Sequence, residues 1–179
     1  MKIINTACVA HTPYLNLMTS SYEDDKGNVK AWEWVERVGQ QNAVVIAALH
    51  KGLLVVIKEF RVPLQDYEWG LPAGLIDHGE DPEVTVRREL HEETGLTVNK
   101  FLRPISPLIY NTAGMTNEGV HMAFVEASGA PSRDLLGESE DITTHLMSQD
   151  EVKALMQQNV KFGAKAYLVF ERFATHGDI

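Results

Sequence analysis

The sequence has 179 residues, 44% of them hydrophobic and 23% charged, which is typical of one globular domain with a hydrophobic core. A formal net charge of −9 argues against a nucleic-acid or anionic-membrane surface, because either would require a basic face. The single cysteine, Cys8, excludes an internal disulfide, and no apolar run approaches the roughly 18 residues of a membrane helix. The N-terminus lacks a signal-peptide core. We therefore expect a cytoplasmic protein with neither a nucleic-acid nor a membrane partner.

The N-terminal segment, residues 1–38, is expected to form strands and a hairpin. Residues 25–28 have the composition of a tight turn. After this turn, Trp32 and Trp34 fall on one face of a period-two segment. Two interpretations stay open. Either the tryptophans pack beneath the main sheet, or one of them is an aromatic platform for a nucleobase, a contact worth about 1–3 kcal/mol.

The segment that follows predicts two apolar strands, residues 43–49 and 53–58, joined by a hairpin at residues 50–52. Arg61 follows the second strand. Its planar guanidinium could clamp a diphosphate, or it could simply pair with a neighbouring acid. Residues 69–74 then predict a rigid loop, in which glycine and proline bring backbone oxygens close to a ligand.

A helix is marked at both ends by its flanking residues. Asp81 is a suitable N-cap, and Pro82 suits the first helical position. Gly95 suits the C-terminal cap, where φ is often positive. Val86 and Leu90, one turn apart, predict an apolar face that can be buried.

Three carboxylates crowd a neighbouring face of this helix. Glu89, Glu92 and Glu93 fall within about 100° of one another. Because they repel one another, we expect a cation to collect them, and all-oxygen ligands select Mg²⁺ or Mn²⁺ over Zn²⁺. Arg88 lies four residues before Glu92 and could hold that carboxylate in place. A solvated acidic face is the alternative, but glycine, arginine and carboxylates recur together across residues 74–96.

Residues 74–96 resemble the Nudix box, G-x5-E-x7-R-E-U-x-E-E-x-G-U with U aliphatic, and every defined position matches. The resemblance implies an α+β domain with the Nudix fold, an α/β/α sandwich with a mixed β-sheet. It also implies a Mg²⁺-dependent hydrolase of a nucleoside diphosphate linked to another group. In that family Glu80 and Arg88 would brace the loop and helix, and the metals would be bound by Glu89, Glu92, Glu93 and a backbone carbonyl near Ala73.

Further segments are similar to the ADP-ribose and nucleoside-diphosphate-sugar pyrophosphatases of that family. Residues 32–37 resemble a W-x-x-V-x-R strand that helps to form the base pocket, often across a dimer interface. This resemblance implies substrate-binding roles for Trp32, Trp34 and Arg37, and a homodimer to which the N-terminal strands contribute. Residues 59–61 are similar to an E-F-R segment that would bring Arg61 to the substrate, and residues 69–74 to W-x-L-P-A-G.

The loop at residues 111–119 resembles the S-P-G-x-x-x-E loop of the same subfamily, with Ala113 in place of the proline. The resemblance implies a substrate contact at Gly114 and a catalytic role for Glu118, which would position or deprotonate the attacking water. Glu93 is the second candidate for this base. The acidic loop at residues 131–141 offers further carboxylates, which could reach a metal or simply be solvated.

The remaining segments complete a single predicted domain over residues 1–179. Residues 120–127 and 142–147 predict strands. Ser148 and Glu151 predict a capping box at the start of a helix, and residues 164–173 predict a last amphipathic helix.

These features predict a pyrophosphatase that cleaves the diphosphate bridge of a nucleotide sugar of the ADP-ribose, ADP-glucose or GDP-mannose type. Its products would be a nucleoside monophosphate and a sugar phosphate. Two alternatives stay open. One is a Nudix hydrolase of modified nucleoside triphosphates or dinucleoside polyphosphates. The other is a Nudix-fold sensor that binds a nucleotide without cleaving it.

Overall fold

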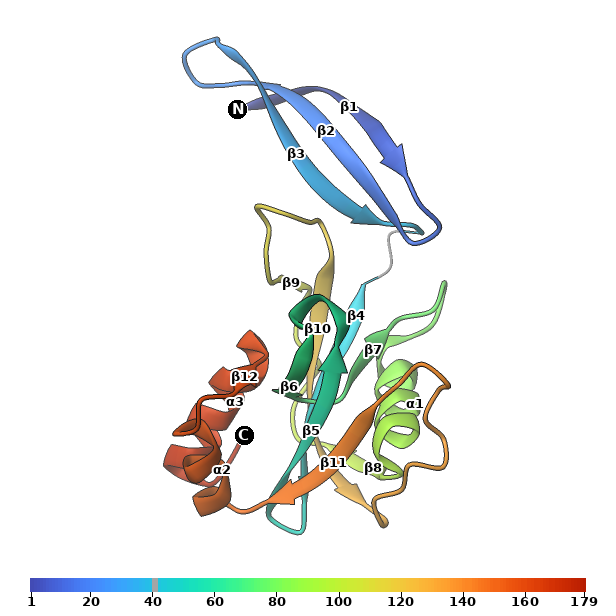
Figure 1. Cartoon of the computed structure of the whole chain (residues 1–179), viewed down its shortest axis with the longest axis vertical. Coiled ribbons are helices and arrows are strands. Elements are labelled where there is room, and N and C mark those ends of the chain that lie inside the picture. Colours follow the sequence, from blue (N-terminus) through green and yellow to red (C-terminus); the bar gives the residue numbers. More distant parts are fainter. Residues whose placement is uncertain (40–41) are drawn as a thin grey trace. The chain divides into compact units, whose positions relative to one another are not determined.

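The computed structural model describes residues 1–39 and 42–179, and the chain divides into two compact units. Unit 1 comprises Met1–Asn42 and Leu108–Val120, and unit 2 comprises Ala43–Pro107 and His121–Ile179. Figure 1 labels the elements of both units. None of the described helices is long and apolar enough to cross a membrane.

Unit 1 is built on a three-stranded antiparallel sheet, β1 (Lys2–His11), β2 (Leu15–Glu23) and β3 (Val29–Arg37), in that order. The turn predicted at residues 25–28 is confirmed. Asp24 closes this turn by accepting the backbone N–H groups of Lys26 and Asn28, both at 2.9 Å, and it pairs with Lys30 at 2.8 Å. Every residue of β1 is exposed, and Ser20 is the one buried residue within these three strands, all of which are described. The sheet therefore has almost no core of its own.

Unit 2 is built on a mixed sheet with the strand order β12-β6-β5-β4-β10-β8. In addition, β11 pairs with β5 and β7 with β4, and the pairing of β12 with β6 is parallel. The central strands β4 and β5 are runs of buried aliphatic residues, as expected for strands covered on both faces. The strands span β4 (Ala43–His50), β5 (Leu53–Arg61), β6 (Asp66–Gly70), β7 (Ala73–Leu75), β8 (Thr97–Phe101), β10 (Gly119–Ser128), β11 (Ile142–Met147) and β12 (Lys161–Phe162). The first two residues of β10 belong to unit 1, where they pair with β9 (Ile109–Tyr110).

Helices cover both faces of this sheet (Figure 1). On one face, α1 (Pro82–Thr94) buries Val86 and Leu90 against β4, β5 and β10. On the other, α2 (Gln149–Met156) and α3 (Ala164–His176) pack together, and α3 buries Phe170 and Phe173. A short 3₁₀ helix, η1 (Val62–Leu64), follows β5. The predicted α/β/α sandwich with a mixed sheet is confirmed.

Several local predictions are also confirmed, and one is wrong. The hairpin at residues 50–52 turns through two positive φ angles, 52° at Lys51 and 79° at Gly52. Ser148 and Glu151 form the predicted capping box. Residues 69–74 are not a loop throughout, because β6 ends at Gly70 and β7 begins at Ala73. A strand as short as β7 has no periodicity of its own, and its pairing partner, β4, lies far away in the sequence.

Candidate active site

Helix α1 begins and ends where its flanking residues predict. The Asp81 side chain accepts the backbone N–H of Glu83 at 2.8 Å. At the other end, Gly95 has φ 75° and donates its N–H to the carbonyl of His91. Since Val86 and Leu90 are buried in the core of unit 2, the rotation of the helix is fixed. Its carboxylate face lies against β7.

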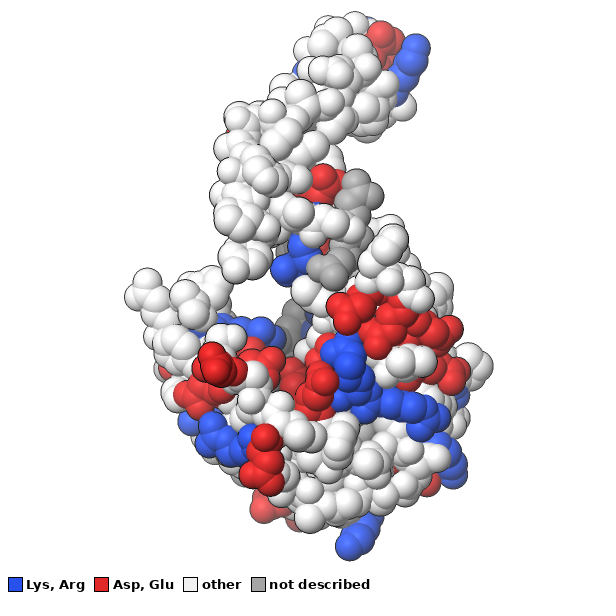
Figure 2. Space-filling view, turned by 90° about the vertical axis from the view of Figure 1, so that its right-hand side faces the viewer, with Lys and Arg blue, Asp and Glu red and all other residues white. Residues whose placement is uncertain are grey.

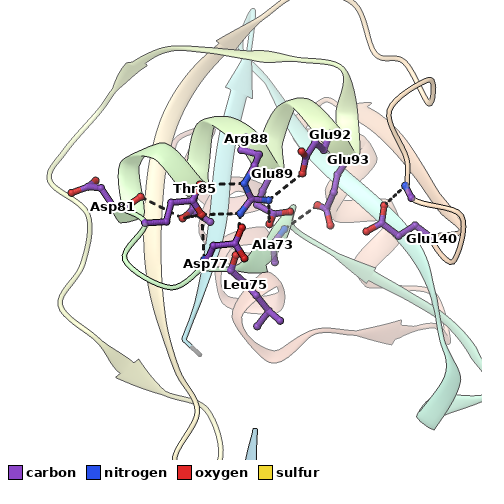
Figure 3. Close-up of polar contacts among 12 residues, drawn as sticks. Ala73, Leu75, Asp77, Asp81, Thr85, Arg88, Glu89, Glu92, Glu93 and Glu140 are labelled. Atoms are coloured by element: carbon purple, nitrogen blue, oxygen red, sulfur yellow. Dashed lines mark hydrogen bonds and ion pairs between the residues drawn. The ribbon is translucent and has the colours of Figure 1, made fainter. Parts of the chain in front are cut away.

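Arg88 connects this helix to the loop that precedes it (Figure 3). It donates to Glu80 from Nε at 3.2 Å and from Nη2 at 2.9 Å, and Nη2 also reaches the carbonyl of Leu75. Its Nη1 bridges the carboxylates of Glu89 at 2.6 Å and Glu92 at 3.1 Å. The guanidinium holds the pKa of Glu80 at about 2, and the three acids raise the pKa of Arg88. These contacts are the bracing expected from Glu80 and Arg88.

Gly74 makes room for the carboxylate of Glu89. A Cβ atom at position 74 would lie 1.9 Å from Cδ of Glu89, so any side chain there would displace the carboxylate. Burial raises the pKa of Glu89. The first glycine of the motif therefore leaves room for this close approach.

Glu93 is the most buried of the three acids, at 5% exposed. Its Oε2 accepts the backbone N–H of Ala73 at 3.0 Å. Burial raises the pKa of Glu93 well above its ordinary value, and the charges of Glu59, Glu89 and Glu140 raise it further. A carboxylate in this environment gains stability when a cation neutralises it.

The donor atoms of this cluster fit a hard divalent cation. The side chains of these three acids offer only oxygen ligands, which Mg²⁺ and Mn²⁺ prefer (Glu89, Glu92 and Glu93). Figure 2 shows Asp and Glu side chains gathered around basic ones on unit 2. Throughout residues 1–39 and 42–179, no three His, Cys, Asp or Glu side chains are arranged to hold an ion as they stand. Instead, Arg88 bridges two of the predicted ligands. Each of these carboxylates has a second oxygen that Arg88 does not contact, so cation binding would require the acidic side chains to change their arrangement but not to leave Arg88.

A carboxylate outside the motif also lies at this cluster. Glu140, on the loop between β10 and β11, faces Glu93 in Figure 3, and its charge raises the pKa of Glu59, Glu89 and Glu93. Its own Oε2 accepts the backbone N–H of Gly137 at 2.8 Å. The sequence shows an acidic loop here but does not single out Glu140, because the contact depends on the path of the loop.

Arg61 lies between two acids of its own sheet. Nη1 pairs with Glu59 at 2.8 Å and Nε with Glu68 at 3.2 Å. This is the neighbouring-acid pairing considered as the alternative to a diphosphate clamp. A role of Arg61 toward substrate stays a prediction.

The other residues predicted to contact substrate lie in unit 1, where the loop at residues 111–118 is attached to β3. Trp32 donates its indole N–H to the carbonyl of Gly114 at 2.9 Å, and Val35 donates its backbone N–H to Met115 at 2.7 Å. Arg37 donates from Nε to Oε2 of Glu118, also at 2.7 Å. These three contacts make the strand and the loop one structural element.

A cavity of about 580 Å³ opens within unit 1 beside this element. Its walls are mostly apolar and include Ile3, Tyr22, Trp32, Trp34 and Tyr110. Trp32 is 52% exposed, so it lines an open pocket and is not a core residue. The cavity favours the aromatic-platform interpretation over packing beneath the main sheet.

The family model "NUDIX domain" matches residues 39–168. The chain belongs to the NUDIX family. It is 29% identical to the ADP-ribose pyrophosphatase of Bacillus subtilis (strain 168), over 87% of this chain and 83% of that protein. It is 30% identical to the GDP-mannose pyrophosphatase of Cronobacter sakazakii (strain ATCC BAA-894), over 78% and 75%.

A solved structure shows the same fold. The crystal structure of an ADP compounds hydrolase matches this NUDIX chain with a TM-score of 0.77 at 20% identity, covering 99% of this chain and 96% of the other. The predicted family is confirmed, and so is the prediction of an enzyme that hydrolyses phosphorus-containing anhydrides.

Proposed function

We propose that the protein hydrolyses the diphosphate bridge of a nucleotide sugar, with Mg²⁺ or Mn²⁺ as cofactor, and releases a nucleoside monophosphate and a sugar phosphate. The main support is the environment of Glu93, a buried carboxylate with a raised pKa, one hydrogen-bond donor and acidic neighbours. Relatives named for ADP-ribose and GDP-mannose support the substrate class. ADP-ribose and GDP-mannose differ in base and in sugar, so the substrate panel described below compares both.

The residues proposed to hold the cation are Glu89, Glu92 and Glu93, with the backbone carbonyl near Ala73. When bound, a divalent cation neutralises diphosphate oxygens and lowers the pKa of a water molecule. Arg88 holds Glu80 through two bonds of its own, so the link between the loop and the helix does not depend on which oxygens of Glu89 and Glu92 the cation takes.

A further carboxylate is needed to accept the proton of the attacking water. We propose Glu140 as the first candidate, because its carboxylate lies at the Glu93 cluster. Glu118, the base implied by the resemblance of its loop, is the second candidate. Its carboxylate is paired with Arg37 within unit 1.

Recognition of the nucleoside is proposed for unit 1. The aromatic walls contributed by Trp32 and Trp34 suit stacking on a base, and Arg37 and Gly114 belong to the same element. Arg61 is proposed to contact the diphosphate.

We also propose a cytoplasmic homodimer. The reason is the thin sheet of unit 1, in which Ile3, Ile4 and Val9 are all more than half exposed. Light scattering at micromolar concentration should give twice the mass of the chain. A monomer with full activity would contradict this assembly.

The central test is a substrate panel with purified protein and Mg²⁺. ADP-ribose, ADP-glucose and GDP-mannose would be compared with a modified nucleoside triphosphate and a diadenosine polyphosphate, with products separated by chromatography. We expect the nucleotide sugars to be cleaved with the highest kcat/KM, and Glu93→Gln protein to serve as the inactive control. Preference for a triphosphate or polyphosphate would support the first alternative. Tight binding without cleavage would support the sensor.

A further inference from the structure

The loop that carries Glu140 is attached to unit 2 at two points. It connects β10 and β11 over residues 129–141 and includes the acidic segment at residues 131–141. Near its start, Ser132 donates its backbone N–H to the carbonyl of Thr94 at 3.0 Å, at the end of α1. This approach depends on Gly95, because a Cβ atom there would lie 2.6 Å from the nitrogen of Ser132. Residues 133–140 between the two attachments are mostly exposed.

The second attachment is Asp141, which follows Glu140 directly. Its backbone carbonyl accepts the N–H of Phe60 at 3.1 Å. Its side chain accepts the hydroxyl of Tyr67 at 2.5 Å and, on the other oxygen, Nη2 of Arg133 at 3.3 Å. The Arg133 pair lies on the surface and within the loop itself, so it fixes the loop to nothing else. Tyr67 is the contact that joins the Asp141 side chain to the sheet.

The Tyr67 ring is itself held in place on β6. Its centroid lies 5.4 Å from that of Phe60, edge to face, across the pairing of β5 with β6. The ammonium group of Lys58 lies 4.7 Å from the Tyr67 centroid. Asp141 raises the pKa of the Tyr67 hydroxyl, which therefore stays protonated and available as a donor. A donor fixed in this way loses little side-chain entropy on forming its hydrogen bond.

We propose that Tyr67 is a positioning residue that acts through Asp141 to hold Glu140 beside the carboxylates of α1. The Cα atoms of Glu140 and Asp141 are separated by one peptide, about 3.8 Å, so fixing Asp141 restricts Glu140 strongly. Within the loop, Glu140 also closes a turn with Gly137 through its backbone N–H and its side chain. Tyr67 does not touch the reacting atoms. This inference rests on the proposed function, in which Glu140 accepts the proton.

The first variant to examine is Tyr67→Phe, which keeps the ring and removes the hydroxyl. The matched control is Tyr167→Phe on α3, where the ring contacts Phe162 and the residue is 44% exposed. We expect Tyr67→Phe to lower kcat about 10-fold with KM changed less than about 2-fold, because Glu140 is misplaced for the proton transfer and not for substrate binding. Amide hydrogen exchange should become faster across residues 133–141 and stay unchanged in α1. The control should match the wild type in every measurement.

A double-mutant cycle with Glu140→Gln shows whether Tyr67 acts through Glu140. We expect Glu140→Gln to lower kcat about 10²-fold or more, and Tyr67→Phe to cause no further loss in that background. Independent, multiplying losses would overturn the proposal, as would unchanged loop exchange or wild-type kcat in Tyr67→Phe. If the wild-type protein cleaves none of the substrates in the panel, the proposed function fails. If the wild type is active and Tyr67→Phe equals it, only the positioning role fails.

Discussion

The two units hold their candidate functional side chains in place in different ways. In unit 2, Glu89 and Glu93 are fixed by α1, which buries Val86 and Leu90 completely in a packed core. In unit 1, the aromatic cavity rests on a sheet with almost no buried side chains, and it is held by hydrogen bonds between β3 and one loop. Rigid packing suits a cluster of like charges, which would otherwise move apart. The cavity of unit 1, with its aromatic walls, suits recognition of a flat aromatic group such as a nucleobase. Substitutions in the carboxylate cluster of unit 2 should therefore change kcat and metal affinity, and those around the cavity of unit 1 should change KM.

Removal of divalent cations should have the largest effect. We expect excess chelator to abolish turnover and Mg²⁺ or Mn²⁺ to restore it, because Glu93 and its acidic neighbours would otherwise repel the substrate. Added Mg²⁺ should also raise the melting temperature, since a ligand bound only by the folded state stabilises it. Full turnover in metal-free buffer would contradict the assignment of unit 2 as the metal-binding part.

Glu93→Gln should separate activity from stability within unit 2. We expect kcat to fall by about 10²–10⁴ and the Mg²⁺ requirement to rise, because a ligand charge is lost. In metal-free buffer at neutral pH, however, the variant should melt at a higher temperature than the wild type. Burial raises the pKa of Glu93 in the folded state above its ordinary 4.5, so its contribution to stability is present below that value and is lost as pH rises through the raised pKa. Glutamine cannot ionise, and its oxygen can still accept the Ala73 N–H.

Glu118→Gln tests the other half of the comparison. The amide oxygen can still accept the Nε hydrogen of Arg37, but the negative charge at position 118 is lost. We expect KM to rise several-fold and kcat to change less than KM, as for an interaction used equally in the ground and transition states. A fall in kcat of about 10²–10⁴ at constant KM would instead assign the general base to Glu118. It would also contradict the assignment of catalysis to unit 2 and of substrate binding to unit 1.

Two glycine substitutions offer a matched pair with a smaller effect. Gly74→Ala places a methyl group on the Glu89 carboxylate, whereas the nearest atom to a Cβ at Gly114 is 3.9 Å away, on Trp32. We expect Gly74→Ala to lower kcat about 10-fold and to require more Mg²⁺, since the methyl group displaces a carboxylate that is proposed to hold the cation. Gly114→Ala should leave kcat and the Mg²⁺ requirement near their wild-type values. Equal effects at the two positions would contradict the close-approach role of Gly74.

The smallest effects should appear in acid. The pKa of Glu80 in unit 2 and that of Asp24 in unit 1 are both lowered to about 2, chiefly by Arg88 and Lys30 respectively. Each group therefore contributes stability above its ordinary pKa of 4.5 or 3.8, and this contribution disappears as pH falls toward 2. Melting curves between pH 6 and pH 2 should show a smaller loss of melting temperature in Glu80→Gln and in Asp24→Asn than in the wild type. An identical pH dependence in all three proteins would show that these pairs do not stabilise the fold.

Features could be predicted from the sequence where the interacting residues lie close together in the chain. The caps at Asp81 and Gly95, the carboxylate face of α1 and the pairing of Arg88 with Glu92 follow from local spacing. The link from Arg88 to Glu80 follows from the resemblance to the family motif. The buried runs of β4 and β5 are likewise local features. Local patterns record such contacts directly.

The features that were not predicted depend on contacts between segments that are far apart in the sequence. β7 is defined by its pairing with β4, and the loop that carries Glu140 is attached to β6 by the hydrogen bond from Tyr67 to Asp141. The loop at residues 111–118 was expected to carry the base, but the sequence does not show that Arg37 pairs with Glu118. Each of these contacts joins segments far apart in the chain, and their side-chain types alone do not select the partner.

The outer edge of unit 1 has a consequence for polymerisation. Among the described strands β1 pairs only with β2, and residues 3–10 of β1 carry no charge. A flat, uncharged edge of this length would template strand after strand and grow into fibres. The register of β1 against β2 shifts between Ile3 and Asn5 and again between Cys8 and Ala10. Such irregularities bend and twist a strand, so the free edge of β1 does not present a regular row of backbone hydrogen-bonding groups to a strand from another chain. Association through this sheet should therefore stop at a closed assembly and not continue into filaments.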